Sequence, residues 1–564
     1  MVNLTEKMGN IWREIKNQPK DILCFYLFLL TFPLSIRKVV AQFPIKGAFN
    51  EYASAYVYLS DLFFLLTMLA GLFLIVNNKK HIMSSSKGYL RTLIHRLFCG
   101  KAVDNSDALG VSLEKITLIK AIKPYFHAIL LGLIFIMLFD HYLWDIWQGQ
   151  VLFWVVCGFL VGSESLNCST WNIFKKGAFI IPLILVIWSF ISVVWSENQL
   201  ISLYRSARFF ELYVLFMYIS LRFVPRILNC VANCSTWNNL QHTDAKKCST
   251  WNNLSDDSSE NVPRGTFGII MFVGVTQAML GIIQVIIQHS VGLFWLRESI
   301  IAPNIAGVAK VIINHQAYIR AYGLFPHPNI LGGFLFFSII ITLLYGKMFH
   351  VEHFKEQKNE DCSTWNNSER DNVQIVPRGT ISHKLLRFVL AIQLLGLVCT
   401  ASKSAILALI IALVYIIVPR GTIVRHKFNK MFHVEHFRIF IVMGLVALGG
   451  LFFFRNEVYG LFAKSFQERR LYTIISERII ADSPIVGVGT GQFTSNAEKL
   501  FPNLEVWQYQ PVHNVFLLIW SEWGIVGLVL FILFLWKLFH INVPRGTILR
   551  KVSSPSGRGC PKDR

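Results

Sequence analysis

The chain has 564 residues, of which 54% are apolar and 15% are charged, and its mean hydropathy is +0.48. Soluble domains contain roughly 45–50% apolar and about 25% charged residues, so this composition excludes an ordinary soluble protein. A formal net charge of +21 would suggest nucleic-acid binding in a soluble protein. In a membrane protein, lysines and arginines in short cytoplasmic loops orient the helices, so we expect no nucleic-acid partner.

The apolar residues fall in blocks of about 15–25 residues, the length needed to cross a hydrocarbon layer roughly 30 Å thick. The first block follows a polar start and leads into further blocks, which is typical of a signal-anchor. The sequence therefore predicts an all-α, polytopic integral membrane protein with about twelve transmembrane helices. These predicted spans lie near 21–38, 55–76, 125–139, 151–163, 178–195, 207–222, 267–289, 329–346, 385–399, 402–418, 438–455 and 515–540.

Basic residues predict which side of the membrane each loop occupies. A cytoplasmic N-terminus, residues 1–20, places the basic loop 77–124 and the basic tail 541–564 in the cytoplasm. It places loop 140–150, which has two aspartates and no lysine or arginine, outside, in agreement with the positive-inside tendency. The predicted transmembrane domain, 21–540, then has outer loops 290–328 and 456–512 and cytoplasmic insertions 223–266, 347–384 and 419–437.

Three short amino-acid words recur in the sequence: Cys-Ser-Thr-Trp-Asn, Val-Pro-Arg-Gly-Thr and Met-Phe-His-Val-Glu-His-Phe. Back-translation links all three to one DNA string, TGTTCCACGTGGAACA, which is its own reverse complement and is read in three frames. We infer that a palindromic DNA element has spread through the gene, always into or beside a loop assigned to the cytoplasm. Insertions survive where no packing or active site is disturbed, so we expect the chemistry at the outer face. The words begin at Cys168, Cys234, Cys248 and Cys362, at Val262, Val376, Val418 and Val543, and at Met348 and Met431.

This element explains side chains that look like metal ligands. His350 and His353, and the copies His433 and His436, have the spacing of zinc ligands. Because the DNA element dictates these residues, we expect no metal site and no cofactor. The repeats are too short and polar to bury a core, which favours disordered insertions over a repeat fold.

Arg320 begins a run, Arg-Ala-Tyr-Gly-Leu-Phe-Pro-His-Pro-Asn, that ends at Asn329. Pro326 and Pro328 prevent regular helix here, and the backbone that they free must be buried in protein or hydrated. A fixed guanidinium beside such a break suits a diphosphate, which it can hold with paired hydrogen bonds. The alternative is an interfacial arginine that reaches lipid headgroups.

Two further motifs lie near the last predicted span. Gly487-Val-Gly489-Thr-Gly491 follows a helix-like stretch with Arg478, and no strand precedes it, so it indicates a tight turn and not a dinucleotide site. His513-Asn514 opens the span at the outer surface. A histidine there can be neutral near pH 7 and accept a proton from a hydroxyl group. The alternative is a hydrogen-bonded interfacial histidine.

In their order, these motifs resemble the O-antigen ligase and polymerase superfamily, which also contains bacterial protein O-oligosaccharyltransferases. The resemblance covers roughly 20–540 without the insertions. The matching pieces are the run 320–329, Thr400-Ala-Ser-Lys403-Ser-Ala405, Pro484 with Gly487-Val-Gly489, His513-Asn514 through Gly524, and Trp195-Ser196 with Tyr204 and Arg208.

The resemblance implies a metal-independent, inverting membrane glycosyltransferase with a GT-C-like architecture in the bacterial plasma (inner) membrane. Its donor is expected to be an undecaprenyl-diphosphate-linked glycan. By position, Arg320 would bind the donor diphosphate and His513 would be the general base or would orient the acceptor. Lys403 stands where the family usually has arginine, so it keeps the charge but loses the planar two-point grip. Further candidates for diphosphate or glycan contact are Asn329, Asn514, Arg205, Arg208 and Arg478.

A flippase or transporter of polysaccharide or lipid-linked sugar is the alternative function. It would favour inverted repeats and charged residues at mid-membrane, whereas the sequence shows no clear repeat and its charges gather at the outer edge. Ligase, polymerase and protein glycosyltransferase share one chemistry, so the acceptor, which can be a saccharide, a lipid or a protein, stays open. Membrane lipids are the other expected partner.

Overall fold

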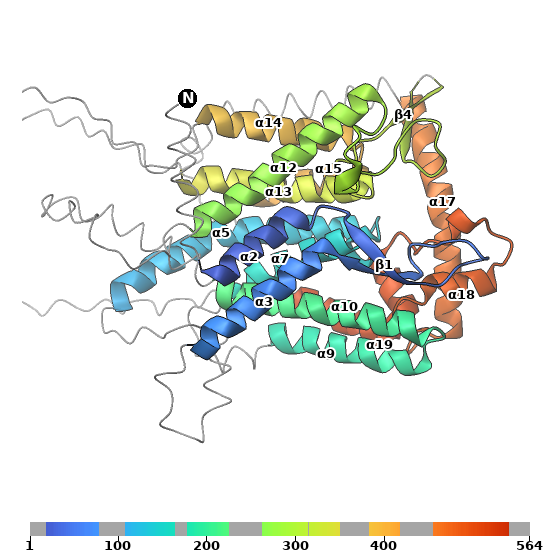
Figure 1. Ribbon diagram of the computed structural model, residues 1–564, viewed down its shortest axis with the longest axis horizontal. Helices are drawn as coiled ribbons and strands as arrows, with labels where there is room; N and C mark the ends of the chain where they lie inside the picture. Colours follow the sequence, from blue (N-terminus) through green and yellow to red (C-terminus); the bar gives the residue numbers. More distant parts are fainter. Residues whose placement is uncertain are drawn as a thin grey trace, which may run out of the picture.

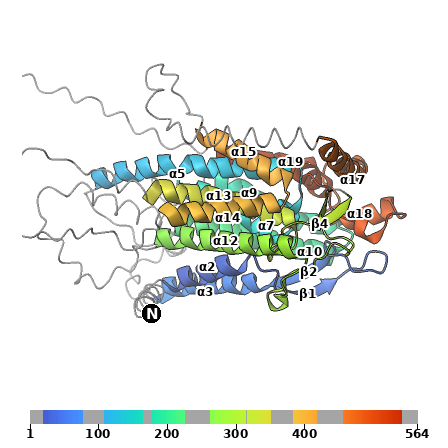
Figure 2. The ribbon, with the colours of Figure 1, turned by 90° about the horizontal axis from the view of Figure 1, so that it is seen from above.

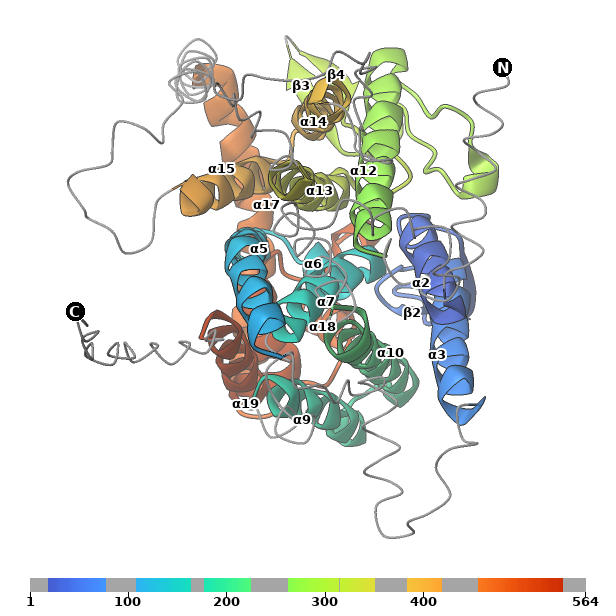
Figure 3. The same ribbon diagram turned by 90° about the vertical axis from the view of Figure 1, so that its left-hand side faces the viewer.

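A computed structural model describes residues 19–77, 108–163, 177–224, 262–313, 315–349, 383–417 and 455–540. Long helices run side by side along the longest axis (Figure 1), and many of them are seen nearly end-on in Figure 3. The helices are α2 (Lys20–Thr31), α3 (Leu59–Asn77), α5 (Ala108–Met137), α6 (Tyr142–Asp145), α7 (Trp147–Gly162), α9 (Gly177–Ile191), α10 (Gln199–Tyr218), α12 (Val262–Ile287), α13 (Pro328–Phe349), α14 (His383–Cys399), α15 (Lys403–Ile417), α17 (Arg455–Asp482), α18 (Phe493–Leu500) and α19 (Val515–Phe539).

Two small antiparallel hairpins accompany the helices. Strand β1 (Arg37–Gln42) pairs with β2 (Ser54–Tyr58), and β3 (Lys310–Ile313) pairs with β4 (Gln316–Ile319). The first predicted span, 21–38, is therefore shorter than expected, because α2 ends at Thr31 and β1 begins at Arg37. Pro33 explains the early end, since a proline has no backbone N–H with which to continue the helical hydrogen bonding.

The mostly helical prediction is confirmed, but the count of twelve spans is not. Among the described residues, four helices are long and apolar enough to cross a membrane: Gly177–Trp195, Thr266–Ile287, Pro328–Lys347 and Val515–Phe539. Four shorter apolar helices are Leu59–Gly71, Ile122–Met137, Trp147–Gly162 and Lys403–Ile417. The predicted span 438–455 lies outside the described residues except at its last position.

Most copies of the repeated words also lie outside the described residues. The copy at Val262 forms the first turn of α12, and the copy at Met348 begins in the last turn of α13. These two copies therefore run into helix ends and are not wholly separate polar insertions.

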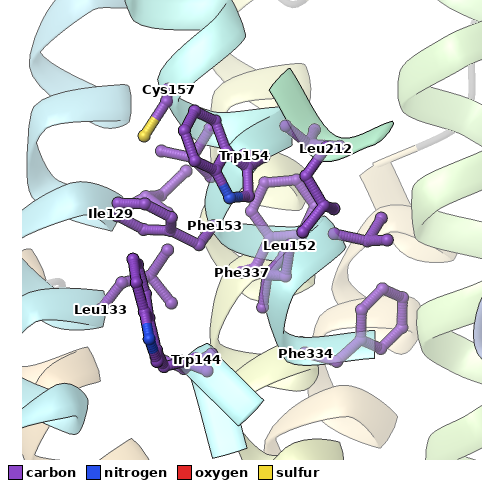
Figure 4. Packing of buried hydrophobic residues seen from close by; sticks show 14 of the residues in the cluster. Ile129, Leu133, Trp144, Leu152, Phe153, Trp154, Cys157, Leu212, Phe334 and Phe337 are labelled. Atoms are coloured by element: carbon purple, nitrogen blue, oxygen red, sulfur yellow. The ribbon is translucent and has the colours of Figure 1, made fainter. Parts of the chain in front are cut away.

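The hydrophobic core surrounds α7, in which nearly every residue is buried. A helix that is apolar all round is stable only when other helices enclose it. Trp154 packs within 5.7 Å of the rings of Phe216 and Phe534, which α10 and α19 contribute. Figure 4 shows this cluster with Ile129 from α5 and Phe337 from α13.

The helix α9 differs, because large apolar side chains on one of its faces are exposed. Ile187 is 49% and Ile180 is 41% exposed. Such a face suits hydrocarbon and not water. Together with the four long apolar helices, it supports a membrane location for the bundle.

The two ends of the bundle differ in character. The connections from α5 to α6, from β4 to α13, and from α14 to α15 lie at the end that appears on the right in Figure 1. Helix α17 lies across this end, roughly at right angles to the long helices, as Figures 1 and 2 agree. Two of the sequence motifs, the run 320–329 and the run 400–405, lie at the second and third of these connections.

The glycine run forms a tight turn, as the sequence indicates, and the structure shows that this loop docks on an interruption in α19. Gly524, inside α19, has φ +66° and ψ −172°, which breaks the helical hydrogen bonding. The loop supplies hydrogen-bond partners to the backbone groups at this break. Ile525 N donates to Pro484 O at 3.0 Å, and Gly489 N donates to Glu522 O at 2.9 Å. Backbone groups at membrane depth must be satisfied within the protein, so the loop and the helix form one structural unit.

Gly489→Ala is expected to destabilise the fold. Gly489 has φ +101°, and a Cβ there would meet the Ser196 hydroxyl. Residues forced into such backbone regions cost about 1–3 kcal/mol, so the melting temperature in detergent should fall. Gly268→Ala is the matched control, because Gly268 lies in α12 with nothing near its added methyl group. Equal melting of the two variants would contradict this account.

Candidate active site

Arg320 lies between β4 and α13 in a segment that is bound to the end of α14. The backbone N–H of Ala321 donates to Cys399 O at 3.0 Å. The guanidinium of Arg320 donates from Nε to Thr400 O at 2.6 Å and from Nη2 to Asn329 Oδ1. Nη1 makes no hydrogen bond to the part of the chain that the structure describes. The side chain is therefore held on two sides and keeps one edge for a ligand.

Asn329, at the start of α13, connects Arg320 to a buried carboxylate. Its Nδ2 donates to Asp140 Oδ2, and its backbone N–H donates to His327 Nδ1 at 3.2 Å. Burial raises the pKa of Asp140 to about 6, against the opposing effects of the Asn329 hydrogen bond and of the Arg469 and Arg320 charges. The carboxylate thus interacts with the cationic region through the amide.

His513 lies immediately before α19 inside a group of rings. The ring centroids of His141 and Tyr472 are 5.0 and 5.3 Å from that of His513, and Tyr142 is 6.5 Å away. Burial and the positive charge of Arg469 lower the pKa of His513 to about 4. Its imidazole is therefore neutral at pH 7, with one nitrogen able to accept a hydrogen bond.

The short connection between α5 and α6 joins the two groups. Asp140 contacts Asn329, His141 packs on His513, and the Tyr142 ring lies 4.4 Å from the His327 ring. Arg320 and His513, which are far apart in sequence, consequently lie in one cluster at one end of the bundle.

Positive charge gathers around this cluster. Lys403, the first residue of α15, lies within electrostatic reach of Arg320 and of Arg469 on α17. Neither Arg320 nor Arg469 forms an ion pair with a carboxylate among the described residues. A site with excess positive charge is suited to an anionic ligand.

The remaining predicted residues lie elsewhere or have other contacts. Arg205 pairs with Asp145 at 2.9 Å, and Arg208 pairs with both Asp61 and Glu211. The side chain of Arg478 is 65% exposed and lies 3.9 Å from Asp482. Asn514 caps α19, because its Oδ1 accepts from Phe516 N and Leu517 N at 2.9 and 3.1 Å. Arg478 is mostly exposed, protein groups hold the other three side chains, and none of the four lies around Arg320.

Sequence reasoning did not assign Asp140, His141, Tyr142 or His327 to the site. The available signal was an acidic residue and an imidazole in a very short polar break between apolar blocks. His327 stands inside the run that begins at Arg320, but the run alone does not show which side its ring faces.

Arg205→Ala is expected to destabilise the protein strongly. Arg205 donates to the carboxylate and the carbonyl of Asp145 and to Tyr52 O, each at 2.9 Å. Removing one partner of a buried pair typically costs about 3–5 kcal/mol. Thermal melting in detergent measures the loss, with Arg478→Ala as the control, because an exposed pair contributes roughly 0–1 kcal/mol. Similar melting temperatures of both variants would contradict a stabilising role for the Arg205 hydrogen bonds.

The lowered pKa of His513 predicts a pH-dependent contribution to stability. In the unfolded chain the pKa of this histidine is near its ordinary value of 6.5, and burial lowers that pKa to about 4 in the folded protein. Its contribution is therefore complete above pH 6.5 and is lost as the pH falls toward 4. The melting temperature of the unsubstituted protein, relative to His513→Asn, should be lower at pH 5 than at pH 7.5. A difference independent of pH would show that this histidine is not held neutral.

The described residues contain no group of three histidine, cysteine, aspartate or glutamate side chains placed to hold one metal ion. The histidines of the repeated words, at 350, 353, 433 and 436, lie outside the described residues.

Residues 388–532 match the family described as O-antigen ligase. This range contains Lys403, Arg469 and His513, whereas Arg320 and Asp140 precede it. Neither the comparison with curated proteins nor that with solved structures gives a match. Residues 388–532 are therefore similar to the O-antigen ligase family, which confirms the superfamily resemblance that the order of the motifs indicates.

Proposed function

We propose that this protein transfers a glycan from an undecaprenyl-diphosphate-linked donor to an acceptor at the outer face of the bacterial plasma membrane. The O-antigen ligase domain supports glycan transfer in general terms. The observation that carries the finer proposal is the gathering of the Arg320, Lys403 and Arg469 charges beside a neutral His513.

The cations have a role in the departure of the lipid diphosphate. Negative charge grows on the diphosphate as its bond to the sugar breaks, and fixed positive charge stabilises it most strongly in a site that excludes water. Arg320 is already held by Thr400 and Asn329, so little reorganisation is needed when the charge develops. Because protein cations can neutralise this charge, we propose a reaction that needs no metal ion.

His513 receives the acceptor. A hydroxyl of the acceptor donates a hydrogen bond to the neutral imidazole and attacks the anomeric carbon opposite the diphosphate. The new C–O bond forms as the bond from the sugar to the phosphate oxygen breaks, which inverts the anomeric configuration. The proton passes to His513 and the electron pair leaves with the undecaprenyl diphosphate. With a pKa of about 4, the imidazole is a weak base and takes the proton late, when the attacking oxygen has become acidic.

The distribution of charge supports the proposed outer-face location. Asp140 and Asp145 lie in the connection that the basic loops assign to the outside. The N- and C-termini are then cytoplasmic, and the repeated words border the opposite face. An undecaprenyl chain can lie among the apolar helices while its diphosphate reaches Arg320 at the membrane edge.

A reconstituted transfer assay tests the proposal. Proteoliposomes receive a prenyl-diphosphate donor with a labelled oligosaccharide and, in separate samples, a saccharide, a lipid or a peptide acceptor. We expect one labelled product and one released prenyl diphosphate per turnover, an inverted anomeric centre by NMR, and undiminished activity in EDTA. A donor that crosses the bilayer with its sugar–phosphate bond intact would identify a transporter and refute the proposal.

A further inference from the structure

The turn Asp140–Tyr142 contacts both halves of the proposed site. It lies between α5 and α6, outside the range that matches the O-antigen ligase family. Asp140 and His141 are almost completely buried, at 1% and 0% exposure. Burial of two ionisable side chains next to each other costs folding free energy unless they have specific partners. We therefore ask what the contacts of these two side chains do in the site.

Asp140 determines the orientation of the Asn329 amide. A carboxylate can only accept hydrogen bonds, whereas an amide has a donor end and an acceptor end. Because the amide nitrogen of Asn329 donates to Asp140 Oδ2, the amide oxygen must face the other way, toward Arg320. If the Asp140 acceptor is removed, the amide is free to turn its nitrogen toward the guanidinium.

The amide orientation in turn determines the plane of the guanidinium. Arg320 has two fixed hydrogen bonds, from Nε to Thr400 O and from Nη2 to Asn329 Oδ1. Two bonds from different nitrogens define the plane of this rigid fork, whereas one bond alone allows rotation. The direction in which Nη1 points therefore depends on Asn329 and, through it, on Asp140.

The next two residues of the turn contact the imidazole half. The His141 ring is 5.0 Å from the His513 ring, and the Tyr142 ring is 4.4 Å from the His327 ring. Both ring nitrogens of His141 are buried without a hydrogen-bond partner among the described residues. His141 therefore contributes packing against His513 and does not compete for the hydrogen bonds of that ring.

The turn is anchored on its other side. Asp145, three residues after Tyr142, accepts from Arg205 through its carboxylate and its carbonyl, at 2.9 Å each. Arg205 also donates to Tyr52 O, beside strand β2. These bonds hold α6 against α10 and fix the position of the turn.

We propose that the turn Asp140–Tyr142 is a positioning element that sets the Arg320 guanidinium opposite His513, with Asp140 acting through the Asn329 amide. This inference rests on the proposed function. It gives Asp140 no contact with the substrate and no part in proton transfer.

Comparison of Asp140→Ala with Asp140→Asn tests the proposal. The asparagine keeps an oxygen that can accept from Asn329, and the alanine does not. We measure binding of farnesyl diphosphate to the full chain in nanodiscs, together with KM and kcat for the lipid-linked donor. A hydrogen bond to a charged group typically changes affinity by about 10–100-fold, so Asp140→Ala should weaken diphosphate binding and raise KM by that factor. Asp140→Asn should stay within about threefold of the unsubstituted protein on the same argument.

Asn329→Ala and the double variant with Asp140→Ala complete the design. Because Asp140 acts through Asn329, the double variant should be no worse than Asn329→Ala, whereas independent contributions would add. Gln393→Ala is the control for loss of a buried amide, since Gln393 bonds Ser338 and Thr342 in the interior of the bundle. Its melting temperature should fall while its diphosphate affinity stays unchanged.

Each outcome decides the proposal. Normal diphosphate binding by Asp140→Ala, or equal losses in Asp140→Ala and Asp140→Asn, would overturn it. If Asp140→Ala does not fold, normal binding by Asn329→Ala would overturn it instead. If the unsubstituted protein binds diphosphate but transfers no glycan, the proposed function is wrong and the binding ratios still test the turn. Failure of the unsubstituted protein to bind diphosphate overturns both.

Discussion

Arg320→Ala is expected to lower the rate of glycan transfer by about 10²–10³-fold, the usual effect of removing one preorganised group that stabilises developing charge. The loss should appear in kcat as well as in KM, because the charge on the leaving diphosphate is greatest in the transition state. Arg320→Lys should recover only part of the rate, since an ammonium group cannot make the two bonds to Thr400 and Asn329 and still present a flat donor edge.

The control for Arg320 is Arg387→Ala, which removes an exposed arginine from the first half of α14. The initial rate of prenyl diphosphate release in proteoliposomes gives the measurement, and size-exclusion chromatography and thermal melting confirm that both variants fold. Retention of more than a tenth of the rate in a folded Arg320→Ala protein would remove this residue from the mechanism.

His513→Ala should lower the rate of transfer by about 10²–10⁴-fold, the range typical of a positioned general base. The loss should fall on attack by the acceptor and leave diphosphate binding almost unchanged, because His513 belongs to the ring group and not to the cationic group. His513→Asn can accept a hydrogen bond but cannot take the proton, so it separates orientation of the acceptor from proton transfer.

Donor binding and transfer are therefore measured separately for the His513 variants. Prenyl diphosphate affinity within about threefold of the unsubstituted protein, combined with lost transfer, agrees with the assigned role. Equal losses of binding and transfer in His513→Ala would place this histidine in donor recognition, and full activity would exclude it from the chemistry.

The sequence was sufficient to predict that Arg320 and His513 lie at the same end of the bundle. Each residue stands next to an apolar span, and the alternation of spans across a membrane determines which span ends share a face. Broken helix at Pro326 and Pro328 marked one of these ends. The tight glycine turn was likewise predictable, because its residues favour backbone angles that few other residues adopt.

Partners of the charged side chains were not predictable in the same way. Arg205 and Arg208 resemble ligand-binding arginines in the sequence, yet Asp145, Asp61 and Glu211 hold them in the structure. Asp145 and Asp61 come from elements that are distant along the chain, so only tertiary packing selects them, whereas Glu211 lies one turn after Arg208 on α10. For the same reason the sequence did not predict a role for Asp140, whose contact with Asn329 joins the ends of two helices.

The number of membrane spans could not be predicted from the sequence either. Several apolar blocks are near the minimum length for crossing the hydrocarbon layer. Where such a block ends early, as α2 does at Thr31, the following residues form a strand that composition alone does not reveal.

The interruption of α19 at Gly524 has a consequence for how this gene can change length. The loop from Pro484 to Gly489 supplies both donors and acceptors to that break, so a codon added to or lost from it would leave polar backbone groups without partners at membrane depth. Tolerance of inserted codons should therefore differ between this loop and the segments that already carry the repeated element. Deep insertional scanning with an in-frame transposon would recover surviving clones from those segments and almost none between residues 484 and 491.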